Sequence, residues 1–228
     1  HRDLHSFPTR RSSDLKQLSY EDELIISDDK STDKTLDIVN DINDRRIRLF
    51  VNEQRLGYTR NFENALSKSS GEIIFLSDQD DVWVENKVEM MLNALSQSQM
   101  VISDAKIVDS NLQTICESHF KLHRVKKGFF VNYVKTRYIG ACMAFKREVL
   151  IKALPFPKLY KYCAHDYWLT LLAESVFKVT LIYTPLIFYR RHNDNASSGG
   201  GLSGNSIVLK ILVRLYSILM LINRLLSK

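Results

Sequence analysis

The sequence predicts an α/β fold in which a mainly parallel sheet carries helices on both faces. Short apolar runs alternate with segments of helical spacing through the first half of the chain. Each run is apolar along its whole length, which is typical of strands that are buried on both sides. The 228 residues suffice for one mid-sized domain, and 45% hydrophobic and 25% charged residues are typical of a folded protein.

The alternating elements extend to about residue 103. We expect strands at residues 23–27, 47–51, 72–77 and 100–103, and helices at residues 31–43, 57–69 and 84–96. Ser31, Thr32 and Asp33 offer capping groups to the first helix, and Gly71 is expected to end the second. The second half is less regular, with a hairpin in 106–115, a strand at 140–146 and a helix at 165–175. An extended segment is expected at 178–189, broken by Pro185.

The two ends of the chain differ in character. Residues 1–15 have no helical or strand period and resemble the translation of a sequencing-library adapter, so we expect a non-native segment there. Residues 205–228 predict a basic amphipathic helix. In this apolar segment, residues that recur every three or four positions form one narrow polar stripe along the helix. The stripe consists of Lys210, Arg214, Ser217, Leu221, Arg224 and Lys228.

The amphipathic segment favours a membrane surface. A spanning helix would bury Arg214 near its middle, which is unfavourable. A helix lying in the membrane interface, with its cations toward anionic headgroups, costs less. Packing on the protein's own core or on a partner chain is the alternative.

Charge and cysteine content exclude some classes of partner. The formal net charge is +6, and residues 206–228 contribute most of it because they contain four Lys or Arg and no acid. A basic groove for nucleic acid is not indicated, since it requires cations clustered on the folded body. Cys116, Cys142 and Cys163 are odd in number and lack zinc-ligand spacing. Together with the lack of an apolar secretory segment, they predict a reduced, cytoplasmic compartment.

Two aspartate clusters lie directly after predicted strands. In open α/β sheets, ligands bind at the carboxyl ends of the strands. Asp78 and Asp80 lie two positions apart on an extended segment, so their side chains point the same way. Their hard oxygen ligands suit Mg²⁺ or Mn²⁺, and a solvated acidic turn that caps the next helix is the alternative.

The first cluster, Asp28 and Asp29, could accept hydrogen bonds from a nucleotide base or a ribose hydroxyl. One of the two could instead cap a helix. Arg60 could pair with either carboxylate, contact a nucleotide or form an ordinary surface salt bridge.

Several segments, in order along the chain, resemble those of family 2 glycosyltransferases, from about residue 23 to residue 198. Residues 24–33 resemble its nucleotide-binding segment, and Asn52, Gly57 and Asn61 its next one. Residues 75–83, Phe-Leu-Ser-Asp-Gln-Asp-Asp-Val-Trp, resemble the D-x-D region of rhamnosyltransferase-like members. The stretches 140–142, 165–168 and 189–195 resemble its acceptor-side, catalytic and late Y-R-x-H-x-x-N segments.

The resemblance implies a GT-A (Rossmann-like) fold and single-step inverting transfer from a nucleotide sugar. It implies Asp166 as the catalytic base, and a metal on Asp78 and Asp80, with His192 as a further ligand or diphosphate contact. The implied donor contacts are Asp28, Asp29, Arg60, Asp78, Arg190 and Arg191. The implied acceptor-side residues are Gly140, Ala141, His165 and Trp168.

The resemblance also assigns residues 16–105 to donor binding and residues 106–204 to acceptor binding and catalysis. It implies a dTDP- or UDP-sugar donor, with the motif forms leaning towards rhamnose. The implied acceptor is a saccharide or lipid-linked saccharide in bacterial surface polysaccharide synthesis, at the inner face of the cell membrane.

Two departures from the family pattern stand out. The family's opening strand is expected to be missing, and Lys30 stands where Gly is common. A receiver-like α/β module with Asp78 as phosphoacceptor is one alternative, but it leaves His165 and Asp166 unexplained. A non-catalytic protein of the same fold is the other.

Overall fold

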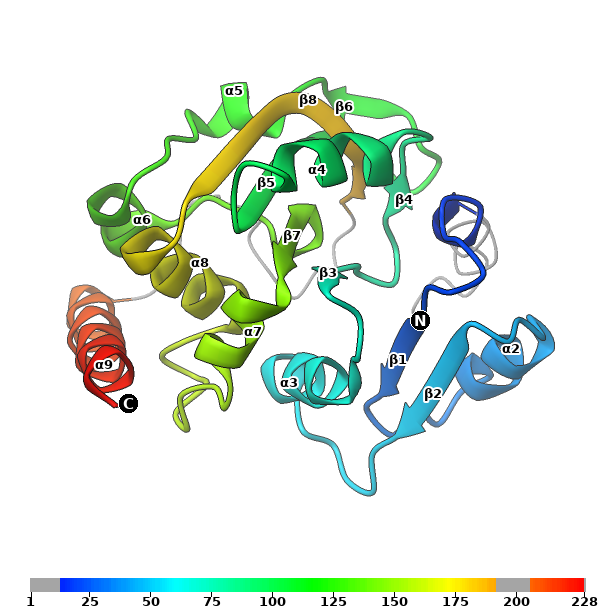
Figure 1. Ribbon diagram of the computed structural model, residues 1–228, viewed down its shortest axis with the longest axis horizontal. Helices are drawn as coiled ribbons and strands as arrows, with labels where there is room; N and C mark the ends of the chain where they lie inside the picture. Colours follow the sequence, from blue (N-terminus) through cyan, green and yellow to red (C-terminus); the bar gives the residue numbers. More distant parts are fainter. Residues whose placement is uncertain (1–12, 192–205, 228) are drawn as a thin grey trace.

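A computed structural model describes residues 13–191 and 206–227 of the chain (Figure 1). It is an α/β structure with two sheets. The smaller sheet consists of the parallel pair β1 (Leu24–Asp28) and β2 (Ile47–Val51), which are joined by α2 (Thr35–Asp41). The larger sheet has the strand order β3-β7-β5-β8-β4, and β6 pairs with β5 at one end.

The larger sheet is formed by strands from the whole remaining chain. Its strands are β3 (Ile73–Phe75), β4 (Val82–Trp83), β5 (Met100–Val108), β6 (Thr114–Cys116), β7 (Met143–Lys146) and β8 (Val179–Arg190). The helices are α3 (Tyr58–Lys68), α4 (Lys87–Leu95), α5 (His119–His123), α6 (Phe129–Lys135), η1 (Gly140–Cys142), α7 (Arg147–Ala153), α8 (His165–Val176) and α9 (Ile207–Leu226).

Strand β5 is the centre of the core, and helices cover both of its faces. Met100 and Ile102 lie in one hydrophobic cluster with α7 and α8, to which fully buried Trp168 belongs. Val101, between them, lies in a second cluster with Met91 of α4. This alternation is expected for a strand, whose successive side chains point to opposite faces. The predicted α/β class with helices on both faces is therefore confirmed.

Helix α3 lies between the two sheets (Figure 1). Its Leu66 is buried in the main core, and its polar side holds β1. Asn61 Nδ2 donates to the Ser27 carbonyl at 2.8 Å, and its Oδ1 accepts from Ser27 Oγ at 2.6 Å. Asn64 Nδ2 donates to Asn52 Oδ1 at 2.9 Å. One helix thus binds the larger core through apolar contacts and the smaller sheet through amide hydrogen bonds.

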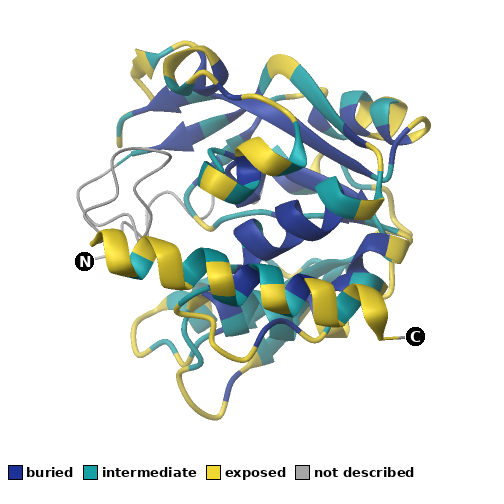
Figure 2. Ribbon diagram, turned by 90° about the vertical axis from the view of Figure 1, so that its left-hand side faces the viewer, coloured by how far each residue is buried: buried dark blue, intermediate teal, exposed yellow. Residues whose placement is uncertain are grey.

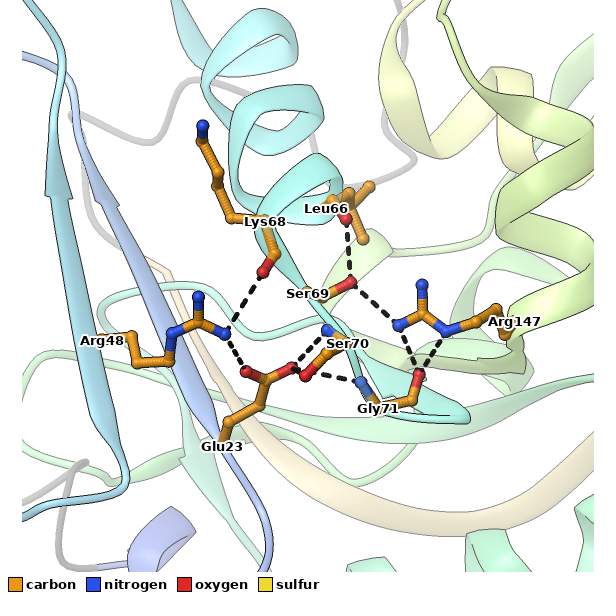
Figure 3. Close-up of polar contacts among 8 residues, drawn as sticks. All are labelled: Glu23, Arg48, Leu66, Lys68, Ser69, Ser70, Gly71 and Arg147. Carbon is orange, nitrogen blue, oxygen red and sulfur yellow. Dashed lines mark hydrogen bonds and ion pairs between the residues drawn. The ribbon is translucent and has the colours of Figure 1, made fainter.

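A second link between the sheets is the Glu23 carboxylate, directly before β1 (Figure 3). It accepts hydrogen bonds from the backbone of Ser70 at 2.5 Å and of Gly71 at 3.1 Å, and from Arg48 at 2.6 Å. Arg147 Nε in turn donates to the Gly71 carbonyl at 2.8 Å. Because β3 starts just after Gly71, these bonds hold the starts of β1 and β3 close together.

Several sequence-based expectations need correction. The sheet pairing is mixed rather than mainly parallel, because β7 and β4 both run antiparallel to their neighbours. Helix α3 ends at Ser69 in an extended conformation, and Gly71 is not a left-handed cap. Its N–H binds Glu23 instead. Strand β8 continues through Pro185, which costs only a shift of register against β5.

The expected hairpin after residue 105 is confirmed by the antiparallel pairing of β5 and β6. Strand β5 runs through residue 105 without a break, so the two predicted halves of the chain share a strand. The prediction of a non-native segment at residues 1–15 stays a prediction, and its first twelve residues lie outside the described part. Ser13 Oγ accepts a hydrogen bond from the backbone of Trp83 at 3.2 Å.

The orientation of the C-terminal helix α9 differs from the expected one. Its stripe faces the protein, because Ser217 and Leu221 are buried. Arg214 Nε donates to the Val134 carbonyl at 3.0 Å, and Arg224 donates to the Leu154 carbonyl at 2.7 Å. These cations therefore do not point away toward a membrane. In the described part of the chain, no helix is both long enough and apolar enough to span a bilayer.

Replacing Glu23 with Gln should destabilise the protein near neutral pH by about 1 kcal/mol, because charge-assisted hydrogen bonds are lost. Burial opposes ionisation of Glu23, but its bonds from Ser70 and Arg48 outweigh burial and lower its pKa below 4.5. A lowered folded-state pKa stabilises above the unfolded-state value, and this contribution is lost as pH falls through the folded-state value.

The free energies of unfolding of wild type and Glu23→Gln should therefore differ at pH 7 and converge as the solution is acidified below about pH 4.5. Chemical denaturation across this range measures the difference. Glu21→Gln, at an exposed neighbouring position, is the control and should show a smaller difference at every pH. A Glu23→Gln difference that is independent of pH would contradict the role of the charge.

Candidate active site

Two aspartates at the end of β1 fix the turn that follows this strand. Asp28 is buried, and its Oδ1 accepts from the Ser31 N–H at 2.8 Å. Asp29 accepts from the N–H groups of Leu56 at 2.6 Å and Gly57 at 2.9 Å. Burial opposes ionisation of Asp29, but these bonds and one from Asn52 lower its pKa. An ionised Asp29 thus holds the loop that leads into α3.

Lys30 has a φ of 61°, at the position where the resemblance described above implies Gly. This left-handed conformation is unfavourable for residues with a Cβ atom, so the preference for Gly has a physical reason. Lys30 Nζ donates to the Glu53 carbonyl at 3.0 Å. The turn thus accepts the lysine at the cost of backbone strain.

The start of α8 brings the predicted base to the start of α3. His165 is buried and stacks on Phe62 of α3, with ring centroids 4.1 Å apart. The ring of Tyr58 lies edge-on to the same imidazole at 6.0 Å. Burial lowers the pKa of His165, although the adjacent Asp166 carboxylate opposes this shift. His165 is therefore a neutral packing residue that fixes where Asp166 lies.

Asp166 is half-buried in the first turn of α8, and its Oδ1 accepts from the Tyr167 N–H at 2.7 Å. Among hydrogen bonds between described residues, its Oδ2 makes none. The carboxylate also raises the pKa of Tyr58, after the larger effect of partial burial. The positive end of the α8 dipole and a carboxylate are complementary. One oxygen of the Asp166 carboxylate is therefore held in place by the backbone of its own helix.

The turn η1 crosses directly over the start of α8. A Cβ atom at Gly140 would lie 3.1 Å from His165 Nε2 and 3.4 Å from Asp166 Cβ, so only glycine fits without displacing them. The next carbonyl, of Ala141, accepts from Lys87 Nζ at 2.9 Å. The predicted acceptor-side segment thus contacts the predicted base through its backbone.

The second aspartate cluster is anchored by its last member. Asp81 is buried, and its Oδ1 accepts from the Arg190 N–H at 3.0 Å, which joins the start of β4 to the end of β8. The Lys87 ammonium lies 4.3 Å over the ring of Trp83. Asp81 and Lys87 therefore fix the backbone on both sides of β4. Asp78 and Asp80, before it, are half-buried.

The predicted metal ligands are placed only in part. Asp78 and Asp80 follow β3 as expected, whereas His192 lies outside the described residues. Within residues 13–191 and 206–227, no three His, Cys, Asp or Glu side chains are grouped closely enough to hold a metal. Two half-buried carboxylates fit a divalent cation that takes its other ligands from a diphosphate.

Two of the predicted site residues have partners within the protein. Trp168 is fully buried, and its indole N–H donates to the Ala153 carbonyl at 2.9 Å, so it supports the core and not the acceptor side. Arg60 forms an ion pair with Glu63 and donates to the Lys158 carbonyl at 3.1 Å. Of its three readings, the salt bridge is the one that the structure supports. Arg190 is the last residue of β8, and Arg191 directly follows it.

Sequence reasoning missed several residues that shape this site. Tyr58 and Phe62 are four positions apart, a spacing that puts them on one face of α3 and could have indicated a shared partner. Asn64 completes the amide network with Asn52. Lys87 had no such signal, because a lysine at a helix start reads as exposed, yet it is fully buried here.

Comparison with known proteins agrees with this geometry. The sequence profile described as Glycosyl transferase family 2 matches residues 12–154, which is more than half of the chain. The chain belongs to glycosyl transferase family 2. This membership excludes the receiver-like alternative.

Curated relatives in this family include two enzymes of Escherichia coli. The chain is 30% identical over 175 residues to WfgD, a UDP-Glc:alpha-D-GlcNAc-diphosphoundecaprenol beta-1,3-glucosyltransferase, covering 75% of this chain and 66% of the relative. It is 27% identical to WfaP, which has the same described activity, covering 82% of this chain and 72% of the relative. A Haemophilus influenzae glycosyltransferase is 28% identical, and the match covers 64% of it. The chain thus spans just under two thirds of WfgD and of the Haemophilus influenzae relative.

Solved structures share the fold. Staphylococcus aureus TarS 1-349 in complex with UDP-GlcNAc superimposes with a TM-score of 0.71 at 18% identity, covering 98% of this chain and 70% of that one. Mannosyltransferase PcManGT from Pyrobaculum calidifontis, in complex with GDP-Man and Mn2+, gives a TM-score of 0.59 at 19% identity, covering 81% and 52%. The predicted GT-A fold is thereby confirmed.

Gly140→Ala should destabilise the protein by about 1–3 kcal/mol, because the added methyl overlaps His165 and Asp166 in a packed region. Thermal and chemical unfolding measure this change. Gly71→Ala is the matched control, since its Cβ would meet only the Ile73 carbonyl oxygen at an ordinary 3.5 Å. Equal effects of the two substitutions would contradict the close approach of η1 to α8.

Proposed function

We propose that this protein is an inverting glycosyltransferase that moves a sugar from a nucleoside-diphosphate donor to a lipid-linked saccharide. The observation that carries the proposal is the position of Asp166. Its carboxylate lies at the start of α8, beneath the Gly140 turn and beside the start of α3, in a chain of glycosyl transferase family 2. A base held at one edge of the sheet is what a single displacement requires.

In this reaction the acceptor hydroxyl oxygen attacks the anomeric carbon, the bond to the diphosphate oxygen breaks, and the configuration inverts. The hydroxyl proton passes to Asp166 Oδ2, while Oδ1 keeps its hydrogen bond to the Tyr167 N–H. The neutral His165 beneath it supplies no competing proton and fixes the direction of the carboxylate by stacking on Phe62.

On the donor side we assign the turn after β1 to the nucleotide. Asp28 and Asp29 shape this turn, and each carboxylate can accept more hydrogen bonds than it makes here. Arg190, Arg191 and His192 are proposed to lie near the leaving diphosphate. Asp78 and Asp80 would hold Mg²⁺ or Mn²⁺. When bound, such a cation neutralises charge on the departing diphosphate.

For the donor we propose UDP-glucose, because both Escherichia coli relatives carry UDP-Glc in their described activity. A dTDP-rhamnose donor is the second candidate, favoured by the sequence forms at residues 78–83 and 165–168. A panel of UDP- and dTDP-sugars, each with a diphosphate-linked lipid acceptor, distinguishes them by which radiolabelled sugar is transferred. If donors bind but no sugar is transferred to any acceptor, the non-catalytic alternative holds.

The acceptor and the place of reaction follow from the same relatives. Both act on a sugar attached to diphosphoundecaprenol. We propose a lipid-linked saccharide acceptor of this class, in surface polysaccharide synthesis at the cytoplasmic side of the cell membrane.

Asp166→Asn should lower kcat by about 10²–10⁴-fold, because the amide cannot take the acceptor proton. Donor affinity should remain within about twofold, since the amide preserves the shape of the side chain. Turnover and donor titration measure the two effects separately. Asp41→Asn, at an exposed position at the end of α2, is the control and should leave both unchanged. Normal turnover by Asp166→Asn would exclude Asp166 as the base.

Removal of divalent cations with EDTA should lower the transfer rate at least about tenfold, and Mg²⁺ or Mn²⁺ should restore it. The unfolding temperature without donor should not change, because the proposed site uses only two side chains of the protein. Mn²⁺ binding in the presence of UDP, followed by electron paramagnetic resonance, should weaken in Asp80→Asn. Full activity in EDTA would remove the proposed role of Asp78 and Asp80.

A further inference from the structure

We propose that the outer faces of α9 and α6, together with residues 159 and 160 between α7 and α8, form a docking surface for an anionic lipid bilayer. This docking surface consists of Phe130, Val131, Val134, Leu159, Tyr160, Ile207, Val208, Ile211, Leu212, Leu215, Leu219, Ile222, Leu225 and Leu226, all of them exposed. Figure 2 shows α9 lying lengthwise across one side of the molecule, with exposed residues along its outer face. Arg214, Ser217 and Arg224 of this helix face the protein, whereas most of its leucine, isoleucine and valine side chains are exposed.

The inward cations are satisfied by the protein itself. The guanidinium of Arg224 donates to the carbonyls of Lys152 at 2.8 Å and Leu154 at 2.7 Å. It also lies 5.6 Å over the ring of Trp168. Arg214 lies 5.5 Å over Tyr167 and donates to the Val134 carbonyl. These bonds fix the rotation of α9 and leave its apolar side uncovered.

The apolar surface continues from α9 onto its neighbours. Tyr133 Oη of α6 donates to the Arg214 carbonyl at 3.0 Å, so the two helices lie side by side. Phe130, on the same helix, is 80% exposed, the most of any large apolar side chain described. The backbone N–H of Leu159 donates to Tyr216 Oη at 2.9 Å, which brings the exposed Leu159 to α9. An exposed apolar surface spread over three segments is typical of an interaction site.

The positive charge near the docking surface indicates which partner it binds. Between residues 118 and 165 the chain contains eleven Lys or Arg and the single acid Glu148. The exposed cations nearest in sequence to the docking surface are Lys126, Lys127, Lys158, Lys161 and Lys210. Segment 206–228 adds no acid. Exposed apolar side chains with exposed cations close to them along the chain fit a membrane with anionic headgroups. A second copy of this face would bring like charges together, which disfavours a symmetric dimer.

Docking in this way would place the catalytic helix next to the bilayer. Arg214 and Arg224 contact Tyr167 and Trp168, the two residues that follow Asp166 in α8. This consequence rests on the proposed function, because only a lipid-linked acceptor must be met at the membrane. The docking surface itself stands on exposure and charge alone.

The test is co-sedimentation of the protein with vesicles, without donor or acceptor. Vesicles of phosphatidylglycerol and phosphatidylcholine should bind the protein at least about tenfold more tightly than phosphatidylcholine alone, with binding weakened by salt. Replacing Ile211, Leu215 and Leu219 with Gln should lower the affinity at least about tenfold. The matched control replaces Val51, Leu92 and Ile115, which are exposed apolar residues elsewhere, with Gln and should bind like wild type.

Three outcomes would overturn the proposal: no binding to either vesicle, equal binding by both triple variants, or a wild-type dimer that the α9 variant converts to monomers. Transfer to a short, water-soluble acceptor separates this proposal from the proposed function. The α9 variant should keep that activity, because it alters no residue of the site. Vesicle binding without any transfer would leave the docking surface standing and refute the enzyme.

Discussion

The junction made by α3 is the constraint on which the rest of the structure depends. Between the described strands, no backbone ladder joins the two sheets, so β1 and β2 are held to the body by side chains. Asn61 of α3 binds the backbone of β1, and Glu23, directly before β1, binds the backbone just before β3. Without this junction the turn at Asp28 and Asp29 would have no fixed position relative to Asp166. A network of amide hydrogen bonds gives such a junction a definite geometry.

The same helix sets the position of the proposed base. Phe62 and Tyr58 lie on the face of α3 that meets His165, and Gly140 closes the other side. A charged imidazole in this packed place would be costly, so burial keeps it neutral. The position of Asp166 is thus fixed by the stacking of His165 on Phe62, by the close approach of Gly140 and by the start of α8. The donor turn and the base are coupled because one helix supports both.

The sequence predicted elements best where periodicity alone decides them. Strand β2 has the expected bounds, and α8 begins at His165 as expected. Predictions failed where a side chain found a tertiary partner that local pattern does not show. Gly71 reads as a helix cap, but its N–H is taken by Glu23. Trp168 follows the proposed base and reads as a site residue, but helical geometry turns it into the core.

The polar stripe on α9 faces the protein, whereas the sequence pattern predicts that it faces a membrane, and the reason is related. A polar stripe in an apolar helix is usually assigned to water or headgroups, because unpaired charge in a protein interior is unfavourable. Here the ends of α6 and α7 present carbonyls that accept from Arg214 and Arg224, and aromatic rings of α8 lie beneath the guanidinium groups. With these partners, the two guanidinium groups are more stable against the protein than in solvent. The helix must then turn its leucines and isoleucines outward, so the apolar surface is a direct consequence of how its arginines are bound.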